Sequence, residues 1–126
     1  KPNYQNTSFI ERNEPEIVPK QGTFLYIWVV RVIAKRTLRT FWGKHKNCEQ
    51  QLKAWYKEVE EAQWKGPGDI KIDYPSASFI RDNRVIFNIK GNDYRLIVKI
   101  NYSYKIVWIR FIGTHADYDK IDANKI

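Results

Sequence analysis

Three apolar segments near the carboxyl end of the chain follow one another with very short links, and this spacing constrains the fold more than any other feature. The segments are residues 84–89, 94–101 and 104–112. The sequence Lys-Gly-Asn-Asp at 90–93 suits a tight hairpin turn, and only residues 102–103 separate the second segment from the third. Links this short force neighbouring strands to run antiparallel. We therefore predict an antiparallel three-stranded unit at the centre of the fold.

Upstream of this unit, the sequence predicts one strand and two helices. Residues 24–34 are rich in β-branched and aromatic side chains, which is typical of a buried strand. Residues 35–46 and 47–64 carry apolar residues at helical spacing. Asn47 and Gln50 match a capping box at the start of the second helix, and a Gly-Pro-Gly sequence follows its end.

The remaining segments complete a predicted order of β-α-α-β-β-β-α. Residues 69–82 are expected to be a connecting stretch. A short final helix is predicted to begin at Thr114, where Thr114 and Asp117 form a Ser/Thr-x-x-acid cap. The predicted fold class is α+β, with a mostly antiparallel sheet, two helices on one face and the other face partly open. We expect residues 1–22 to be an irregular extension, either an ordered arm or a mobile tail, and 23–126 to be the folded domain, which suits a chain of 126 residues.

The alternation of side chains along a strand assigns residues to the two faces of the predicted sheet. The face toward the helices is expected to carry apolar side chains: Val85, Phe87, Ile89, Leu96, Val98, Ile100, Val107, Ile109 and Phe111. The opposite face is expected to gather four cations, Lys90, Arg95, Lys99 and Arg110, beside Trp108. Cations bind phosphates and aromatic rings stack on unpaired bases, so this face is a candidate RNA surface. Periodicity alone favours an ordinary solvated sheet face with scattered Lys and Arg.

The charge of the chain favours a polyanionic partner. Lys and Arg total 22 against 14 Asp and Glu, a formal net charge of +8, and residues 1–30 contribute none of it. Nucleic acid is the commonest polyanion, although charge can also serve solubility. The longest apolar run, residues 24–30, is too short to cross a bilayer and has no basic cluster before it, so neither a membrane span nor a signal peptide is expected.

Cysteine and histidine are too scarce for disulfide or metal chemistry. The single cysteine, Cys48, has no internal partner, which fits a reducing compartment such as the cytoplasm. Two His and one Cys at scattered positions do not form a metal-ligand set, and no cofactor is predicted. The chain contains no Met, and a translation start near Val30 is conceivable.

The end of the third late strand leads into residues with catalytic chemistry. Arg110 lies on that strand, and His115, Tyr118 and Asp119 follow just after it. A histidine can transfer a proton at neutral pH, and an arginine can hold a phosphate with two hydrogen bonds. RNA supplies its own nucleophile, the 2′-hydroxyl, so cleavage needs no metal. The alternative is that His115 and Tyr118 have only structural roles.

Residues 31–126 resemble the HigB-type toxins of the RelE-like group of toxin–antitoxin modules. The resemblance rests on five stretches: RVIAKRTLRTFW at 31–42, LKAWYKEVEEAQW at 52–64, DIKIDYPSAS at 69–78, RVIFNIKGNDYRLIVKINY at 84–102 and IRFIGTHADYDKI at 109–121. The ordered combination GN-x-YR, IR-F-x-G-TH and x-YDKI is specific. The N-terminal 29 residues depart from the family pattern, in which the first strand usually begins the protein.

The resemblance implies a RelE-like fold and a toxin that cleaves mRNA, typically on the translating ribosome. It also implies neutralisation by a HigA-type helix-turn-helix antitoxin, through which alone operator DNA would be bound. Carried over to this chain, Arg95 and Arg110 bind phosphate and stabilise the transition state, and His115 is the acid–base residue. Tyr118 orients or stacks on the substrate and Asp119 supports the site. Lys71 and Lys90 are lesser candidates for RNA or ribosome contact.

Three hypotheses follow from the sequence. The first is a metal-independent endoribonuclease toxin. The second is a module that binds RNA or the ribosome without cleavage, which would not require the combination of Arg110, His115 and Tyr118. The third is a degenerate toxin that is retained for its contacts with an antitoxin.

Overall fold

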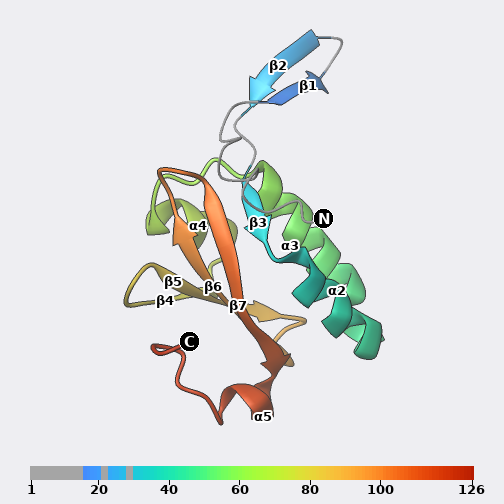
Figure 1. The fold of residues 1–126 in the computed structure, drawn as a ribbon, viewed down its shortest axis with the longest axis vertical. Helices are drawn as coiled ribbons and strands as arrows, with labels where there is room; N and C mark the ends of the chain where they lie inside the picture. The colour runs from blue at the N-terminus through green and yellow to red at the C-terminus, as the bar shows by residue number, and fades with distance from the viewer. Residues whose placement is uncertain (1–15, 21–22, 28–29) are drawn as a thin grey trace.

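The computed structural model describes residues 16–20, 23–27 and 30–126, and the side chains from residue 30 onward. Its main body is one five-stranded sheet with helices (Figure 1). In chain order the elements of this body are β3 (Arg31–Ile33), α2 (Lys35–Lys44), a 3-10 turn (Lys46–Cys48), α3 (Glu49–Glu61), α4 (Pro67–Asp73), β4 (Ser78–Ile80), β5 (Arg84–Ile89), β6 (Tyr94–Asn101), β7 (Ile106–Thr114) and α5 (His115–Tyr118).

The sheet has the strand order β3-β7-β6-β5-β4. Strands β4 to β7 are antiparallel to their neighbours, and β3 joins the edge parallel to β7. The parallel pair is possible because α2 and α3 lie between these strands in the chain and carry it back across the sheet. The predicted α+β class with a mostly antiparallel sheet and a short C-terminal helix is confirmed.

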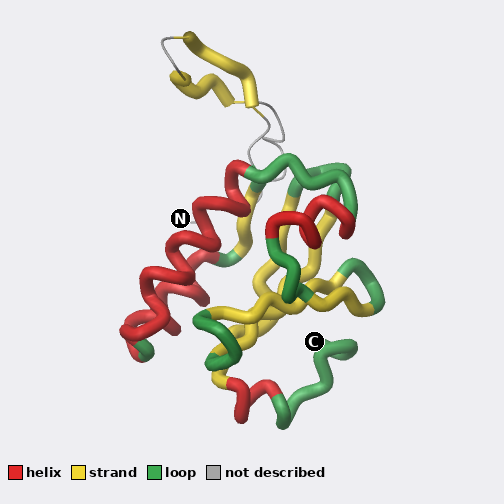
Figure 2. Tube along the Cα trace, turned by 180° about the vertical axis from the view of Figure 1, so that it is seen from behind, coloured by secondary structure: helices red, strands yellow, loops and turns green. Residues whose placement is uncertain are grey.

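The core lies between the helices and one face of the sheet. Leu38, Leu52, Trp55 and Val59 are buried on the helices α2 and α3, at the positions expected from helical periodicity. Helix α4 covers the same face, behind the sheet in Figure 1 and in front of it in the reverse view of Figure 2. The sheet side of the core is formed by the predicted inward residues of β5 and β6: Val85, Phe87, Ile89, Leu96, Val98 and Ile100.

The predicted single strand over 24–34 is wrong, because this segment contributes to two different sheets. Its first part belongs to β2 (Thr23–Ile27), which pairs with β1 (Glu16–Lys20) in a separate antiparallel hairpin. Its last part is β3, which pairs with β7. The irregular conformation expected for 1–22 is therefore wrong for 16–20. The rest of that expectation falls on residues 1–15 and 21–22, which lie outside the described residues.

The second helix begins and ends differently from the prediction. Cys48 occupies the N-cap of α3, and the Asn47 side chain instead accepts a hydrogen bond from the Tyr94 hydroxyl, 2.6 Å away. The predicted capping box therefore does not form. The helix ends at Glu61, and Pro67 begins α4 rather than only terminating α3, because proline suits the first turn of a helix. The expected connecting stretch 69–82 thus contains most of α4 and all of β4.

A β-bulge in β7 changes which of its side chains face the core. Ile109 lies opposite Val98 but Phe111 lies opposite Ile97, so Arg110 is an extra residue in β7. Beyond the bulge the alternation is shifted by one position. The prediction that Phe111 faces the helices is therefore wrong, and Ile112 packs against the core instead.

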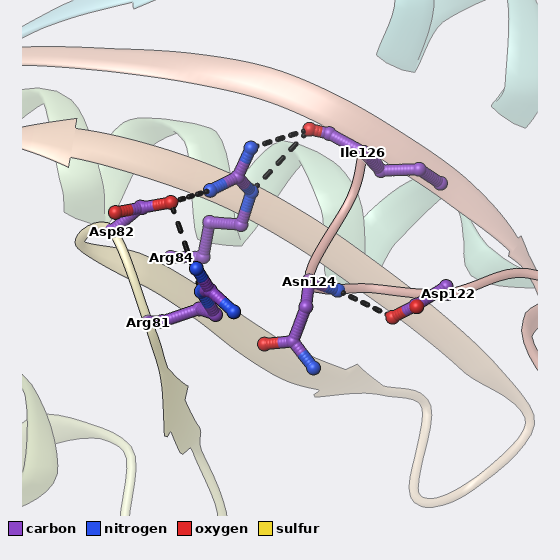
Figure 3. Close-up of polar contacts among 6 residues, drawn as sticks. All are labelled: Arg81, Asp82, Arg84, Asp122, Asn124 and Ile126. Carbon is purple, nitrogen blue, oxygen red and sulfur yellow. Dashed lines mark hydrogen bonds and ion pairs between the residues drawn. The ribbon is translucent and has the colours of Figure 1, made fainter.

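The face of the sheet opposite the helices, here called the second face, is only partly open. Ile86 and Ile97 lie opposite each other on it and are buried. Arg84 is also on this face and is only 9% exposed. After α5 the chain turns back toward the sheet, and the Ile126 carbonyl accepts hydrogen bonds from Arg84 Nη2 at 2.9 Å and Nε at 3.3 Å (Figure 3). Asp82 pairs with the same guanidinium.

No helix in the part of the chain that the structure describes has the length and apolar character needed to cross a bilayer. The longest of them, α3, has 13 residues and a charged outer face.

Stability at alkaline pH is expected to depend on Tyr56. Burial, followed by the nearby Glu60 carboxylate, raises the pKa of Tyr56 to about 12. The unfolded chain releases this proton near pH 10, so the folded state holds more protons between about pH 10 and 12. The free energy of unfolding should therefore fall as pH rises through this window, and Tyr56→Phe should reduce the fall. Urea titrations at pH 9 and pH 11 measure the free energy of unfolding of both proteins.

The control for this experiment is Tyr104→Phe, because Tyr104 is 60% exposed. It should show the same loss of stability between the two pH values as the unmodified protein. An equal pH dependence of the Tyr56→Phe variant and the unmodified protein would contradict the expectation.

Candidate active site

The register of β6 and β7 assembles a polar site at one end of the sheet. Tyr94 lies opposite Thr114 and Arg95 lies opposite Gly113, so the start of β6 is beside the end of β7. Helix α5 begins directly after β7, and the backbone amide of His115 donates a hydrogen bond to the Asp93 carbonyl. Residues that are about twenty positions apart in sequence therefore meet at this corner (Figure 1).

Arg95 is held in place by its backbone surroundings and by Tyr118. Its Nη1 donates to the Asn92 carbonyl at 3.1 Å and is 3.5 Å from the carbonyl of Tyr94. Its guanidinium lies 5.7 Å from the centre of the Tyr118 ring, which is a cation–π distance. The side chain is half-buried. An arginine oriented in this way can present the rest of its planar fork to a phosphate.

His115 forms a pair with Asp119 on the surface of α5. The two residues are one helical turn apart, and His115 Nδ1 lies 3.1 Å from Asp119 Oδ2. Both side chains are more than half exposed. If the Nδ1 atom donates its proton to the carboxylate, the Nε2 atom is left to accept or donate a proton at a bound ligand.

The predicted cap orients this short helix. The amide of Asp117 donates to Thr114 Oγ1 at 3.1 Å, and the amide of Thr114 donates to Asp117 Oδ2 at 3.4 Å. The reciprocal capping box that Thr114 and Asp117 predicted is confirmed. It fixes the direction in which α5 leaves the sheet, and so it fixes the place of His115.

The other predicted site residues are distributed over several places. Lys99 and Trp108 lie directly opposite each other on the second face, the face that also carries Arg95. Lys99 lies four positions after Arg95 along β6, which is about 13 Å. Arg110 is exposed at the bulge of β7.

Two of the predicted lysines, Lys90 and Lys71, interact with groups outside this corner. Lys90 lies in the turn before β6, where its side chain is 3.9 Å from the Asp93 carboxylate. Burial raises the pKa of the nearby Cys48 thiol, and the positive charge of Lys90 partly opposes this rise. Lys71 is on α4, and its Nζ donates to the Ala77 carbonyl at 2.8 Å. The structure therefore brings Arg95, His115, Tyr118 and Asp119 together and places Lys71 elsewhere.

Gly113 is a site residue that the sequence analysis missed. It lies opposite Arg95, and a Cβ atom built on it would be 2.6 Å from Phe111 Cζ and 3.2 Å from Asp117 Cβ. The Phe111 ring thus occupies the space that a side chain at 113 would need. The only signal in the sequence is a glycine within an otherwise apolar strand, which indicates a close approach.

Gly113→Ala is expected to destabilise the fold and to displace α5. The added methyl must push away the Phe111 ring or the Asp117 side chain, and overpacking of this kind costs about 1–3 kcal/mol. Urea unfolding measures the loss. Gly43→Ala is the matched control, because nothing lies within 4 Å of a Cβ at that position of α2. There, alanine should raise the free energy of unfolding by about 0.5–1 kcal/mol. An equal effect of both substitutions would contradict the steric argument.

A protein-family model matches residues 48–121, which include α3, the strands β4 to β7 and the whole of this corner. Its description is HigB toxin, the RelE-like toxic component of a toxin–antitoxin system. This match places the chain among RelE-like toxic components of toxin–antitoxin systems, and the α+β fold is consistent with that class. Within that class, the chain belongs to the HigB toxin family, as its motifs indicated.

Curated relatives cover most of the chain. The chain is 24% identical over 94 residues to the mRNA interferase HigB of Escherichia coli O6:H1 strain CFT073, which is 73% of this chain and 91% of that protein. It is also 24% identical over 92 residues to the mRNA interferase toxin HigB of Escherichia coli K12 and to the mRNA interferase HigB of Shigella flexneri, with 88% of each covered.

Proposed function

We propose that this protein is an mRNA interferase, the toxin of a type II toxin–antitoxin module, and that it cuts messages on the translating ribosome. The family and the names of its relatives support the toxin and the mRNA substrate. The observation that carries the chemical part is the pair of His115 and Asp119, 3.1 Å apart, at the same corner as Arg95. A HigA-type antitoxin is the proposed partner, and the cytoplasm is the proposed location.

The proposed reaction is a transfer of the phosphate within the RNA itself. The 2′-oxygen of the message attacks the adjacent phosphorus, and the bond from phosphorus to the 5′-oxygen breaks. One proton leaves the 2′-hydroxyl and one is gained by the departing 5′-oxygen, so the products are a 2′,3′-cyclic phosphate and a 5′-hydroxyl. No metal is required for this step. His115 is proposed to transfer one of these two protons through Nε2.

The remaining residues of the corner have supporting roles in this proposal. The Arg95 fork binds the non-bridging oxygens of the phosphate, where negative charge increases in the transition state. Arg110, exposed at the bulge, is proposed to bind the same phosphate or a neighbouring one. Tyr118, which already stacks on Arg95, would contact a base. Lys99 and Trp108 would extend the contact along the second face.

Primer extension on a reporter mRNA tests the function. The purified protein is incubated with the message, once on programmed ribosomes and once without ribosomes in EDTA. Cuts that appear only with ribosomes are expected. Cuts in the ribosome-free arm would contradict the dependence on the ribosome. The absence of cuts in both arms, with folded protein, would favour a binding module or a degenerate toxin.

Asp119 is proposed as a positioning residue, which acts through His115. Asp119→Asn should lower kcat by about 10- to 100-fold with little change in KM, because the imidazole loses its orientation while RNA contacts remain. Asp122→Asn is the matched control, an exposed carboxylate of the same segment that lies 4.0 Å from Lys125 Nζ and accepts a hydrogen bond from the Asn124 amide at 3.0 Å, which an asparagine oxygen can still accept. Steady-state kinetics on programmed ribosomes measure both. A rise in KM without a fall in kcat would contradict a positioning role.

A further inference from the structure

We propose that the exposed face of α2 is a second RNA-binding surface, which holds the phosphates of double-helical RNA beside the catalytic corner. This surface, here called the α2 basic face, consists of Lys35, Arg36, Arg39 and Lys44. The inference rests on the proposed function in so far as its RNA would flank the message at the cleavage site. The family model begins at residue 48, so α2 lies outside the segment that it matches.

The net charge of the chain is concentrated around this helix. Residues 31–48 contain six Lys or Arg and no Asp or Glu. They therefore carry +6 of the formal +8, whereas residues 49–126 have 13 basic and 11 acidic residues. A short segment that carries only positive charges produces a strong positive potential at the nearby surface, and this potential attracts a polyanion.

The cations of the α2 basic face are directed to solvent and are not neutralised. All four side chains are exposed. Among the residues whose side chains are described, no ion pair involves any of these four cations, and Lys46, just beyond the helix, lies 4.0 Å from Glu49. Lys35 lies 4.3 Å from the centre of the Tyr56 ring, a contact that leaves its charge in place.

This arrangement opposes the stability of the helix itself. Lys35 and Arg36 are in the first turn of α2, which contains no acidic residue. Cations at that end interact unfavourably with the helix dipole. Lys35 and Arg39 are also a like-charged pair four residues apart, which is destabilising. A charge pattern that weakens its own helix is better explained by a ligand than by local structure.

The composition of the surface favours a nucleic-acid backbone over a protein. Protein interfaces usually have an apolar or aromatic centre and are depleted in lysine. The large apolar side chains that are exposed among the described residues are Ile72, Phe79 and Tyr104, and none of them is on α2. Between its cations the α2 basic face offers only Thr37, Thr40 and Gly43. This polar, cationic composition is typical of contacts to phosphates.

The same surface favours a duplex over a single strand. Single-strand binding combines cations with aromatic rings on which bases stack. The aromatic residues of α2 are already occupied, since Phe41 stacks on His45 and Trp42 lies under Lys53 at 5.5 Å. Double-helical RNA needs no such rings, because proteins recognise it by its shape and its backbone.

The α2 basic face is structurally connected to the catalytic corner. The rings of Phe41 and His45, at the carboxyl end of α2, lie 5.5 and 5.7 Å from the ring of Tyr94. Tyr94 immediately precedes Arg95, and its hydroxyl bonds to Asn47 just beyond α2. Tyr94 and Arg95 point to opposite faces of the sheet, so one RNA that contacts both surfaces would pass round the end of the sheet at which β6 begins.

The test uses a blunt 16-base-pair RNA duplex and fluorescence anisotropy at several salt concentrations. The triple variant Arg36→Gln, Arg39→Gln, Lys44→Gln removes three charges from the α2 basic face. The control triple variant Lys57→Gln, Lys65→Gln, Arg81→Gln removes three exposed charges from other elements. Both variants have the same net charge, so a difference between them measures position rather than total charge.

The first variant should bind the duplex at least about 10-fold more weakly, and its plot of log affinity against log salt should be shallower by about 2. The control should change by less than about 3-fold. Equal losses in both variants, or no loss in the first, would overturn the proposal. It would also be overturned if the first variant bound duplex normally but failed to bind the antitoxin, because the face would then serve a protein. Thermal unfolding should show the first variant to be no less stable than the unmodified protein.

Two further outcomes separate this proposal from the proposed function. His115→Ala should bind the duplex as tightly as the unmodified protein, since His115 is not part of the α2 basic face. If the unmodified protein cut no message but its duplex binding depended on α2, the ribonuclease function would fail and the surface would stand. If messages were cut normally by the first variant and its duplex binding were unchanged, the surface would fail and the function would stand.

Discussion

Replacing His115 by alanine is expected to reduce mRNA cleavage by about 10²- to 10⁴-fold, the range lost with a general acid or base. The imidazole is the group at the corner that can transfer a proton near neutral pH. The substitution should leave the fold intact, because the side chain is 51% exposed and its side-chain partner, Asp119, is 60% exposed. Growth after induction without antitoxin and primer extension on programmed ribosomes measure the loss.

His45→Ala is an informative companion to this substitution. His45 is the other histidine of the chain, and it stacks on Phe41 with ring centres 4.3 Å apart. The His45→Ala substitution should lower the free energy of unfolding more than His115→Ala does. The folded molecules of the His45→Ala variant should still cleave mRNA at most of the normal rate. Full toxicity of the His115→Ala protein would refute the acid–base role.

Replacing Arg95 by glutamine is expected to reduce cleavage by about 10²- to 10³-fold, the cost of removing a group that stabilises charge in the transition state. Arg95 lies opposite Gly113, so no side chain across the strand separates its guanidinium from α5. Arg95→Lys keeps the charge but loses the planar fork, and it should restore only a small part of the activity. Single-turnover cleavage on programmed ribosomes gives the rates.

The control for Arg95 is Arg81→Gln, which removes an arginine that is 74% exposed in the turn before β5. It should cleave at nearly the normal rate. If Arg95→Gln raised KM and left kcat unchanged, Arg95 would contribute to binding and not to the transition state. If Arg95→Lys were fully active, charge alone would suffice and the fork would have no special role.

Local patterns predicted the central strands of the fold well, because short links and alternation determine them. The bounds of β5 and β6 agree with the prediction, and so does the cap of α5. The corner could also be predicted, since antiparallel pairing of β6 and β7 places Arg95 near His115. That pairing was expected from a two-residue link, whereas the actual link is residues 102–105, because β7 begins at Ile106 rather than at Tyr104.

The errors arose where partners distant in sequence decide the structure. Nothing within 24–34 reveals that β2 pairs with β1 while β3 pairs with β7. The bulge at Arg110 follows from the register between two strands, and the strand sequence alone showed only regular alternation. Asn47 was an acceptable helix cap by local rules, but the Tyr94 hydroxyl uses its oxygen. Tertiary contacts overrode the local preference in each of these cases.

The bulge in β7 also makes the identity of residue 110 independent of the pairing between β6 and β7, which would depend on each other in a regular strand. On either side of Arg110 the neighbouring residues keep their partners on β6, Val98 and Ile97, so residue 110 can be changed or removed without shifting the rest of the pairing. Its exposed side chain adds little to the stability of the core. A change of side chain at this position should therefore alter the phosphate contact proposed for Arg110 while leaving the folded state almost unchanged, so the effect of this residue on cleavage can be measured apart from its effect on folding.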